Sequence, residues 1–367
     1  MHLADIQPEK YLELFGTKIK RTFDLLSPFN PPDPTCFPSD PLGFRLRAEF
    51  RVWHEKDDLH YVMFNPSEPR ERISVIDFPV AAPVITNVMP ILRERLRTTK
   101  ELRTKLFQVE FLSTLSGNLL ISLIYHRKLG MSWHSEAEAL RKILCCSLIG
   151  RSRKQKIVLG EEWVLEKLNI GDKQYHFRQP EQCFTQPNGR INEQMINWLV
   201  ANCTETKTDL LELYCGIANF TIPIAGRFRR ILATEVNKAA ANAAKWNVNY
   251  NNLSNVELVR MSAEDVNIAF NRKRVFRRLS HLNQPLEAYR FGTVLVDPPR
   301  AGLDSETLNF VSGFNKIVYF SCNPITLAEN LNALYQSHTI EALAFFDQFP
   351  YTEHMESGLI LTRRSVE

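Results

Sequence analysis

The sequence predicts two domains of different fold class, an α+β domain followed by an α/β domain, and three observations lead to this expectation. In the second half of the chain, apolar strand patterns alternate with amphipathic helix patterns, the order that builds a mostly parallel sheet with helices on both faces. In the first half, apolar and polar residues alternate at every second position, as in antiparallel strands with one polar face. The 367 residues and 44% hydrophobic content suffice for two packed cores.

The first segment, residues 1–41, is expected to be a helix followed by an extended arm. The helical pattern covers residues 8–14 and could continue to residue 26. Residues 28–41 are rich in proline, which lacks the backbone N–H that helices and central strands need. This arm could lie on either domain.

The second segment, residues 42–180, is expected to form the α+β domain with antiparallel strands. Alternation predicts strands over residues 44–54, 59–64 and 118–126. Helical periodicity predicts helices over residues 84–105 and 136–146.

The third segment, residues 181–367, is expected to form the α/β domain. Strands are predicted over residues 209–213, 230–234, 256–260, 293–296, 316–320, 340–346 and 358–362. Helices are predicted over residues 191–201, 219–227, 238–250 and 326–336. In such a fold, ligands bind at the carboxyl ends of the strands.

Composition permits a polyanionic partner without demanding one, because the net charge is +4. Basic residues form three clusters, each of which could simply be a solvated face. The clusters are Arg93, Arg95, Arg97, Lys100, Arg103 and Lys105; Arg151, Arg153, Lys154 and Lys156; and Arg272, Lys273, Arg274, Arg277 and Arg278.

Cysteine usage and the termini predict a reduced, cytoplasmic setting. The seven cysteines include no C-x-x-C pair, so neither a disulfide framework nor a metal or iron–sulfur site is expected. The N-terminus has no apolar signal core and no run is long enough to cross a bilayer. No protein partner is implied.

Cys322 stands where the predicted strand 316–320 gives way to a helix beginning near residue 325. Asn323 can cap that helix, and Pro324 suits its first turn. The free N–H groups and the positive end of the helix dipole should favour the thiolate there. A cysteine after a strand is otherwise a small buried hydrophobic residue, so the nucleophile reading depends on the rest of the chain.

The turn after strand 209–213 has the features of a cofactor site. Gly216 would let the backbone approach a ligand closely, and Glu235, about twenty residues later, could accept both hydroxyl hydrogens of a ribose. With a single glycine, phosphate binding is weakly supported, and a ligand with a charged amino-acid part fits at least as well. The alternative is an ordinary strand–helix turn.

The segment Asp297-Pro298-Pro299-Arg300 follows another buried strand. Two consecutive prolines hold the acid and the guanidinium rigidly at the carboxyl edge of the sheet. Arg300 could bind a phosphate bidentately or pair with Asp304. The segment therefore indicates a site more than a scaffold.

Four motifs in this order and spacing closely resemble the S-adenosylmethionine-dependent RNA uracil-C5 methyltransferases, over the whole chain. They are Leu213-Tyr214-Cys215-Gly216, the segment from Asp297 to Leu303, Ser321-Cys322-Asn323-Pro324, and the segment from Phe349 to Glu356. The chain is most similar to the branch that acts on uridine 54 in the T-loop of tRNA. The resemblance implies a Rossmann-like methyltransferase domain, S-adenosylmethionine as methyl donor, and an RNA-binding role for the first domain.

The resemblance also assigns roles to residues. Cys322 corresponds to the nucleophile and Glu356 to the general base, and Gln186, Tyr214, Gly216, Asn219, Glu235 and Asp297 correspond to cofactor-binding positions. In this sequence Ile217-Ala218 replaces a more polar, glycine-bearing pair, which puts cofactor affinity in more doubt than activity. The four cysteines of an iron–sulfur cluster and the additional N-terminal β-barrel, found in ribosomal-RNA branches, are not visible, so tRNA is favoured.

RNA contacts are expected from basic and aromatic side chains. Arg47, Glu49 and Arg51 share one face of a strand by alternation, and Glu49 could instead orient the two arginines. Phe107, Phe349 or Tyr351 could stack in place of the flipped base, although Phe107 could equally be a core residue. The expected partner is the T-arm of tRNA, with other RNAs that contain a T-loop-like stem-loop possible. The alternatives are the same chemistry on ribosomal RNA, or a protein that mainly binds and refolds tRNA.

Overall fold

The computed structural model describes residues 6–64, 68, 71–204, 207–272 and 274–365. Within these ranges, eight strands form a C-terminal sheet in the order β1-β16-β17-β15-β14-β11-β12-β13. The strands are β11 Asp209–Leu213, β12 Ile231–Thr234, β13 Val256–Val259, β14 Phe291–Val296, β15 Lys316–Ser321, β16 His338–Phe346, β17 Glu356–Arg363 and β1 Thr35–Phe37. The neighbouring strands from β13 to β15 are parallel, and only β17 is antiparallel to its neighbours. The expected α/β class is confirmed.

Side-chain alternation explains why this sheet is covered on both faces. In β15, Ile317 and Tyr319 belong to one core cluster, whereas Val318 and Phe320 belong to another. Helices α5 Gly189–Asn202, α6 Thr221–Ile224 and α7 Lys238–Tyr250 supply the second cluster, and α8 Ala263–Phe270, α9 Ser305–Val311 and α10 Pro324–Leu334 supply the first. Helices α8 and α9 were not predicted, because their patterns are too short to indicate a helix.

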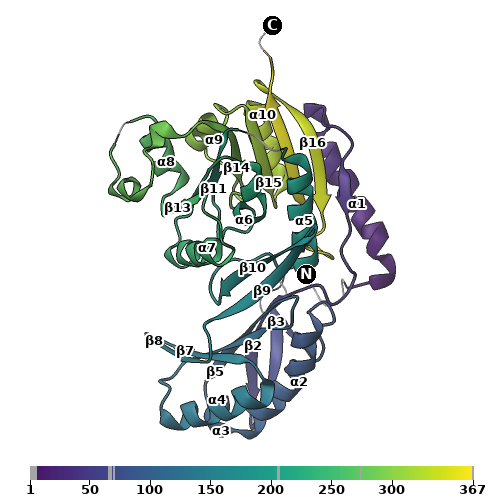
Figure 1. Cartoon of the computed structure of the whole chain (residues 1–367). Coiled ribbons are helices and arrows are strands. Elements are labelled where there is room, and N and C mark those ends of the chain that lie inside the picture. Colours follow the sequence, from purple (N-terminus) through teal and green to yellow (C-terminus); the bar gives the residue numbers. More distant parts are fainter. Residues whose placement is uncertain (1–5, 65–67, 69–70, 205–206, 273, 366–367) are drawn as a thin grey trace.

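The N-terminal sheet has the order β4-β3-β2-β5-β6-β7-β8 among the described residues. Its strands are β2 Arg47–Glu55, β3 Asp58–Phe64, β4 Arg72–Ser74, β5 Leu106–Ser113, β6 Leu119–Tyr125, β7 Ser147–Ser152 and β8 Gln155–Leu159. The expected antiparallel pairing holds except between β6 and β7, which are parallel because α4 Met131–Leu144 crosses between them. Helices α2 Pro83–Thr98 and α3 Lys100–Arg103 pack beside α4 (Figure 1).

A hairpin of β9 Trp163–Ile170 and β10 Lys173–Pro180 forms a separate sheet between the two larger ones. It packs on α5 and α7 of the C-terminal part (Figure 1). The carboxyl ends of the parallel strands point toward the N-terminal sheet, as the arrow of β16 shows in Figure 1. The domain bounds 1–41, 42–180 and 181–367 remain our proposal.

The arm formed by residues 28–41 corrects one expectation. It contains a strand, β1, which pairs in parallel with β16 and extends the C-terminal sheet, so the arm belongs to that part of the molecule. An edge strand needs only one side of its backbone paired, which is why a proline-rich segment can supply it. The preceding helix α1 Tyr11–Leu26, after a 3₁₀ turn at Pro8–Lys10, reaches the longer limit expected and lies against α10.

A buried ion pair holds α1 on the loop before β17. The Lys18 ammonium lies 2.5 Å from the Asp347 carboxylate and also donates to the Phe349 carbonyl, while the Tyr11 hydroxyl donates to Asp347. We expect Lys18→Met to lower the free energy of unfolding by about 3 kcal/mol, because Asp347 would stay buried without its cation. Urea denaturation measures this, with Lys20→Met on the exposed face as control. Equal stability of the two variants would contradict the prediction.

Within the described residues, none of the helices has the length and hydrophobicity required to span a membrane.

Candidate active site

A cavity of about 440 Å³ opens at the carboxyl edge of the C-terminal sheet. It brings together both predicted catalytic residues, all six predicted cofactor residues and Arg300. Its lining comprises Gln179, Phe184, Thr185, Gln186, Tyr214, Cys215, Gly216, Ile217, Asn219, Phe220, Glu235, Asp297, Pro298, Pro299, Arg300, Cys322, Phe349 and Glu356. The lining residues come from the ends of β10, β11, β12, β14 and β15, from the start of β17 and from loops beside them.

The turn that carries Cys322 has the local structure expected from its sequence. Asn323 is the N-cap of α10, its side chain accepts from the Ile325 N–H, and Pro324 occupies the first turn. The Asn323 amide also donates to the Arg300 carbonyl at 3.0 Å, which joins this turn to the Asp297–Arg300 loop. Cys322 is therefore held on a rigid turn facing the cavity.

The predicted thiolate, however, is not favoured. Burial, followed by the charges of Glu356 and Asp297, raises the pKa of the Cys322 thiol to about 11, and the Arg300 charge only partly opposes them. The expectation from the helix start alone was wrong, because it included neither the burial of the thiol nor the two carboxylates from distant strands. Cys322 needs added positive charge, or a proton on a neighbouring carboxyl, to become a thiolate at neutral pH.

Glu356 and Asp297 form a pair of acids at the base of the cavity. Glu356 is 3% exposed at the first position of β17. Burial, and secondarily the Asp297 charge, raises the pKa of Glu356 well above its ordinary value. Burial raises the pKa of Asp297 to about 7. Asp297 can thus exchange a proton near neutral pH, and the Glu356 carboxyl binds its proton more tightly than an exposed glutamate does, as suits a general base.

The turn after β11 is shaped by left-handed backbone at three positions. Tyr214, Gly216 and Ala218 have φ of 61°, 56° and 69°. A Cβ on Gly216 would meet nothing of the protein within 4 Å and would extend into open space, so the glycine keeps the backbone accessible to a ligand. Ala218 carries a steric cost in this conformation that glycine would avoid. This agrees with the resemblance, in which the pair at positions 217 and 218 usually contains a glycine.

Two sets of hydrogen bonds fix Glu235 and Asn219, two of the predicted cofactor-binding residues. The Glu235 carboxylate accepts from the N–H groups of Gly216 and Asn237, at 3.0 and 2.6 Å. The side-chain amides of Asn219 and Asn192 donate to each other at 2.8 and 2.9 Å. Sequence reasoning missed Asn192, which lies on α5 in an ordinary helical pattern and gives no local signal.

The cavity fits S-adenosylmethionine by its unpaired polar atoms. The buried Oε1 atoms of Gln186 and Glu356 have no hydrogen-bond partner among the described residues. Buried acceptors normally find a donor, and the amino group and ribose hydroxyls of this molecule are donors. Together with the open backbone at Gly216, these acceptors make the residues present compatible with the methyl donor.

The predicted RNA-binding row lies outside this cavity. In the part of the chain that the structure describes, the cavity lining lacks Arg47, Glu49, Arg51 and Phe107. Glu49 and Arg51 line a second cavity of about 460 Å³ between β2, β3 and the loop 349–354. Arg47 instead donates to the carbonyls of Glu181 and Cys183, so it holds β2 to the start of the C-terminal part.

Phe107 takes part in a stack with its neighbours. Its ring lies 4.2 Å from the His126 ring, and the Arg51 guanidinium lies 4.1 Å from its centre. Phe349 lines both cavities, and His354, next to it on the same loop, contacts Arg300 at 3.1 Å. Phe349 is thus better placed than Phe107 to stack beside a base at Cys322.

Glu212 is a buried acid that the sequence analysis did not identify. Its position between two leucines in a buried strand could have indicated burial. It is 1% exposed in β11, and burial raises its pKa to about 8 from 4.5. Between pH 4.5 and about 8, the folded protein therefore keeps a proton on Glu212 that the unfolded chain has lost. The contribution of this group to the free energy of unfolding is greatest below pH 4.5 and is lost as pH rises through about 8.

We expect Glu212→Gln to reduce the pH dependence of stability. In the wild type, Glu212 should lower the free energy of unfolding by about 1.4 kcal/mol per pH unit between roughly pH 5 and 8. The neutral amide removes this slope. Denaturation at several pH values measures it, with exposed Glu329→Gln as control, and an unchanged slope in Glu212→Gln would refute the assignment.

Across the described residues, no group of three or more His, Cys, Asp or Glu side chains is arranged to hold a metal ion.

Comparison with known proteins agrees with this geometry. The family model described as tRNA (Uracil-5-)-methyltransferase matches residues 10–364. A tRNA/tmRNA (uracil-C(5))-methyltransferase of Aromatoleum aromaticum is 50% identical, covering 99% of this chain and 98% of that protein. One from Colwellia psychrerythraea is 48% identical, covering 98% and 100%.

A solved structure supports the fold. The Pyrococcus abyssi tRNA (uracil-54, C5)-methyltransferase in complex with S-adenosyl-L-homocysteine has a TM-score of 0.71 at 20% identity, covering 96% of this chain and 83% of that chain. The extent of the family match and the identity to full-length relatives confirm the resemblance seen in the motifs. The chain belongs to the tRNA (uracil-5-)-methyltransferase family and is an S-adenosylmethionine-dependent methyltransferase of that class.

Proposed function

We propose that this enzyme methylates carbon 5 of uridine 54 in the T-loop of tRNA through a covalent adduct of Cys322. The observation that carries the proposal is the single cavity lined by Cys322, Glu356 and all the cofactor-type residues. The names of the relatives from A. aromaticum and C. psychrerythraea include tmRNA as well as tRNA. An RNA with a T-loop-like stem-loop is therefore a second substrate in this proposal.

Cys322 activates the base. Carbon 5 of uracil is a poor nucleophile, and addition of the Cys322 sulfur to carbon 6 places the electron pair of the C5–C6 double bond on an enolate whose carbon 5 can attack a methyl group. The proton of the thiol must leave first, and the carboxylates beside it are its available acceptors. Asp297, whose pKa burial raises to about 7, can take that proton, which leaves Glu356 as a carboxylate for the later step.

Glu356 completes the reaction. Once carbon 5 carries the methyl group, its remaining proton must be removed so that the electron pair re-forms the C5–C6 double bond and expels the Cys322 thiolate. A carboxylate at the floor of the same cavity, with one oxygen unpaired among the described residues, is suited to accept that proton.

Gln186, Tyr214, Gly216, Asn219, Glu235 and Asp297 would hold S-adenosylmethionine. When bound, it supplies an electrophilic methyl group on a positively charged sulfur, and that charge opposes the carboxylates that raise the pKa of Cys322. Asp297 would orient the amino-acid or sulfur end, while the Glu235 carboxylate keeps acceptor capacity beyond its two backbone hydrogen bonds.

The target base would enter between the N-terminal sheet and the loop 349–354. The second cavity, lined by Glu49 and Arg51, shares Phe349 with the Cys322 cavity. A flipped uridine needs an aromatic surface and a route from a folded loop. The shared aromatic ring supports an RNA path from the face of β2 to Cys322.

Methyl acceptance by different RNAs tests the substrate. Unmodified tRNA should be methylated at far lower enzyme concentration than ribosomal-RNA fragments of similar length. Preference for the ribosomal fragments would favour the alternative substrate. A protein that mainly binds and refolds tRNA would instead show no methyl transfer, while its RNA binding survives Cys322→Ala.

A further inference from the structure

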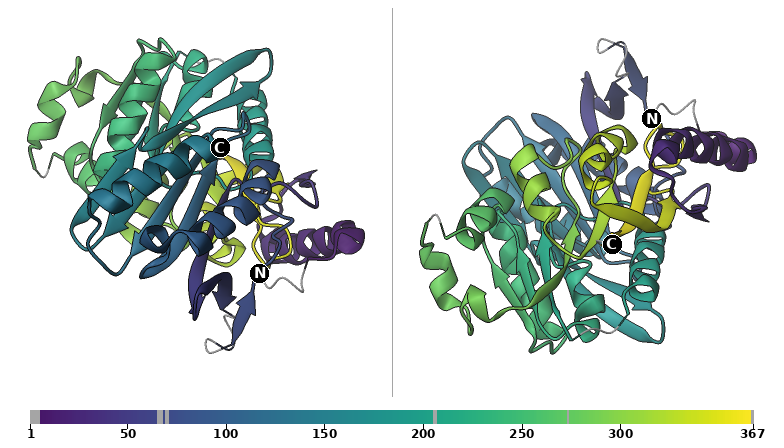
Figure 2. Two further views of the ribbon diagram at one scale, coloured as in Figure 1. Left: turned by 90° about the horizontal axis from the view of Figure 1, so that it is seen from below. Right: turned by 90° about the horizontal axis from the view of Figure 1, so that it is seen from above.

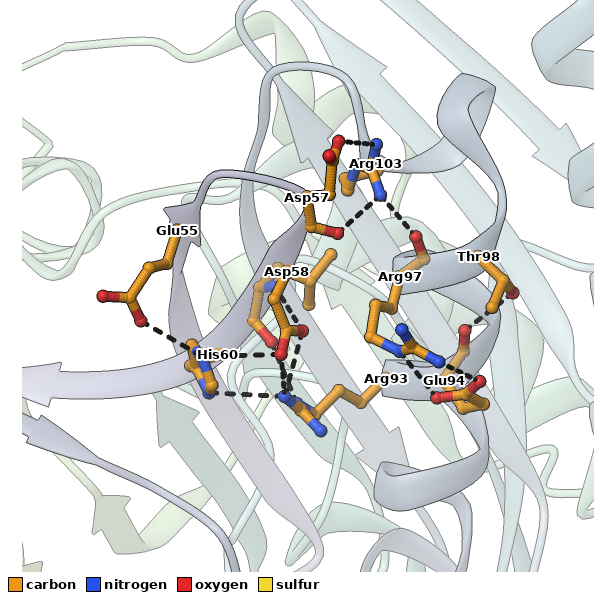
Figure 3. Close-up of polar contacts among 10 residues, drawn as sticks. Glu55, Asp57, Asp58, His60, Arg93, Glu94, Arg97, Thr98 and Arg103 are labelled. Atoms are coloured by element: carbon orange, nitrogen blue, oxygen red, sulfur yellow. Dashed lines mark hydrogen bonds and ion pairs between the residues drawn. The ribbon is translucent and has the colours of Figure 1, made fainter.

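The three basic clusters differ in how far acidic residues neutralise them. In the first, Arg93, Arg97 and Arg103 pair with Asp58, Glu94 and Asp57 (Figure 3). In the second, Arg151 and Lys156 both contact Glu181, at 2.5 and 3.4 Å. These five paired side chains therefore serve the folded structure.

The third cluster remains largely positive; its Lys273 lies outside the described residues. Arg272 pairs with Glu287 at 3.7 Å. Arg274, Arg277 and Arg278 are exposed and have no acidic partner among the described residues. We call residues 274–290 the basic arm; it contains four arginines and one glutamate. Beside the arginines, Val275 is 96% exposed.

The basic arm is fastened to the edge strand β13. The Asn283 N–H and the Tyr289 hydroxyl both donate to the Glu257 carboxylate, at 2.8 and 2.9 Å. The Arg278 guanidinium donates to the carbonyl of Arg260, directly after the carboxyl end of β13. Two of these contacts fix the arm along the edge, and the third brings its arginines to the edge of the sheet where the active-site cavity opens.

The position of the basic arm suits contact with a part of a large ligand that lies far from the active site. Figures 1 and 2 show the segment after α8 on the side of the sheet opposite α1. Four strand spacings separate β13 from β15, which carries Cys322, so the arm lies roughly 19 Å from the reacting base along the sheet. A nucleoside or a methyl donor cannot span this distance, whereas a folded RNA can.

We propose that the basic arm binds the phosphate backbone of the RNA substrate at a distance from the methylated base, with Arg274 and Arg277 as its principal contacts. The proposal rests on the proposed function for its ligand. Exposed guanidinium groups without acidic partners fit phosphate oxygens. Phosphate contacts position an RNA without reading its sequence. The arm therefore contributes to affinity and takes no part in the chemical step.

The double variant Arg274→Gln, Arg277→Gln tests this, with unmodified full-length tRNA as the probe. We expect Kd at about 0.1 M salt to rise roughly tenfold, and the slope of log Kd against log salt to fall by about 2, because each substitution removes one guanidinium–phosphate interaction. The kcat at saturating tRNA should stay at the wild-type value, because neither residue lines the active-site cavity.

The matched control is Arg363→Gln, Arg364→Gln, which removes the same charge from exposed positions at the opposite, amino edge of the sheet. It should change Kd less than twofold. The proposed role of the basic arm would be overturned if both double variants lost affinity equally. It would also be overturned if Arg274→Gln, Arg277→Gln kept the wild-type Kd and salt slope. Methylation of the same tRNA by the wild-type enzyme is measured first, because it separates the two proposals. If the wild type does not methylate the tRNA, the proposed function is overturned. If it does, and the Kd of the Arg274→Gln, Arg277→Gln variant is unchanged, only the proposed role of the basic arm is overturned.

Discussion

Cys322→Ala should abolish methyl transfer, lowering its rate on the order of 10⁴-fold or more. Without the sulfur no enolate forms, and carbon 5 stays too weak a nucleophile to take a methyl group. Folding should be unaffected, because Cys322 is only partly buried on a turn that Asn323 and Pro324 define by themselves. Rates on unmodified tRNA, with denaturation curves beside them, make the measurement.

Cys145→Ala is the matched control, since this thiol is exposed and lies outside the cavity. It should methylate tRNA at the wild-type rate and form the same adduct on a denaturing gel. Substantial methyl transfer by Cys322→Ala would sink the covalent mechanism.

Glu356→Gln should trap the protein on its RNA. Glutamine keeps the size of the side chain but cannot accept the C5 proton, so the methylated adduct cannot expel Cys322. The same change removes a charge that raises the pKa of Cys322, so the thiolate should form more readily. Both effects increase the adduct, and most of the enzyme should migrate as a protein–RNA band on a denaturing gel.

Two further measurements make this prediction specific. Alkylation of Cys322 by iodoacetamide should begin at lower pH in Glu356→Gln than in the wild type, because the pKa of the thiol falls. Glu353→Gln, on the exposed loop before β17, should show neither effect. If Glu356→Gln turns over without accumulating the band, another group removes the proton.

Local sequence patterns predicted the parts of the fold that are determined locally. β11 and α7 have the bounds expected, because a short apolar run and a full helical period each identify their own ends. β1 was missed because pairing with β16 outweighs the proline-rich composition of the arm. β17 could be predicted as a strand, but its antiparallel insertion between β15 and β16 depends on the whole sheet.

In the candidate site, too, some features could be predicted from local motifs and others depend on the whole fold. Its residues could be chosen from the motifs that carry the family resemblance, and the structure brings them into one cavity. The electrostatics could not be predicted, because the raised pKa of Cys322 depends first on burial and then on Glu356 and Asp297, and only the folded sheet buries the thiol and brings these carboxylates near. Arg47, chosen as an RNA contact from alternation, donates to two backbone carbonyls more than 130 positions later.

The central claim is that this chain places a methyl group on carbon 5 of one uridine, and mapping that methyl group tests it most directly. Unmodified tRNA is incubated with the wild-type enzyme and methyl-labelled S-adenosylmethionine, digested, and each labelled nucleoside is identified and located. We expect one label per tRNA, as 5-methyluridine at position 54 of the T-loop. A label on another atom or another base would contradict the claim.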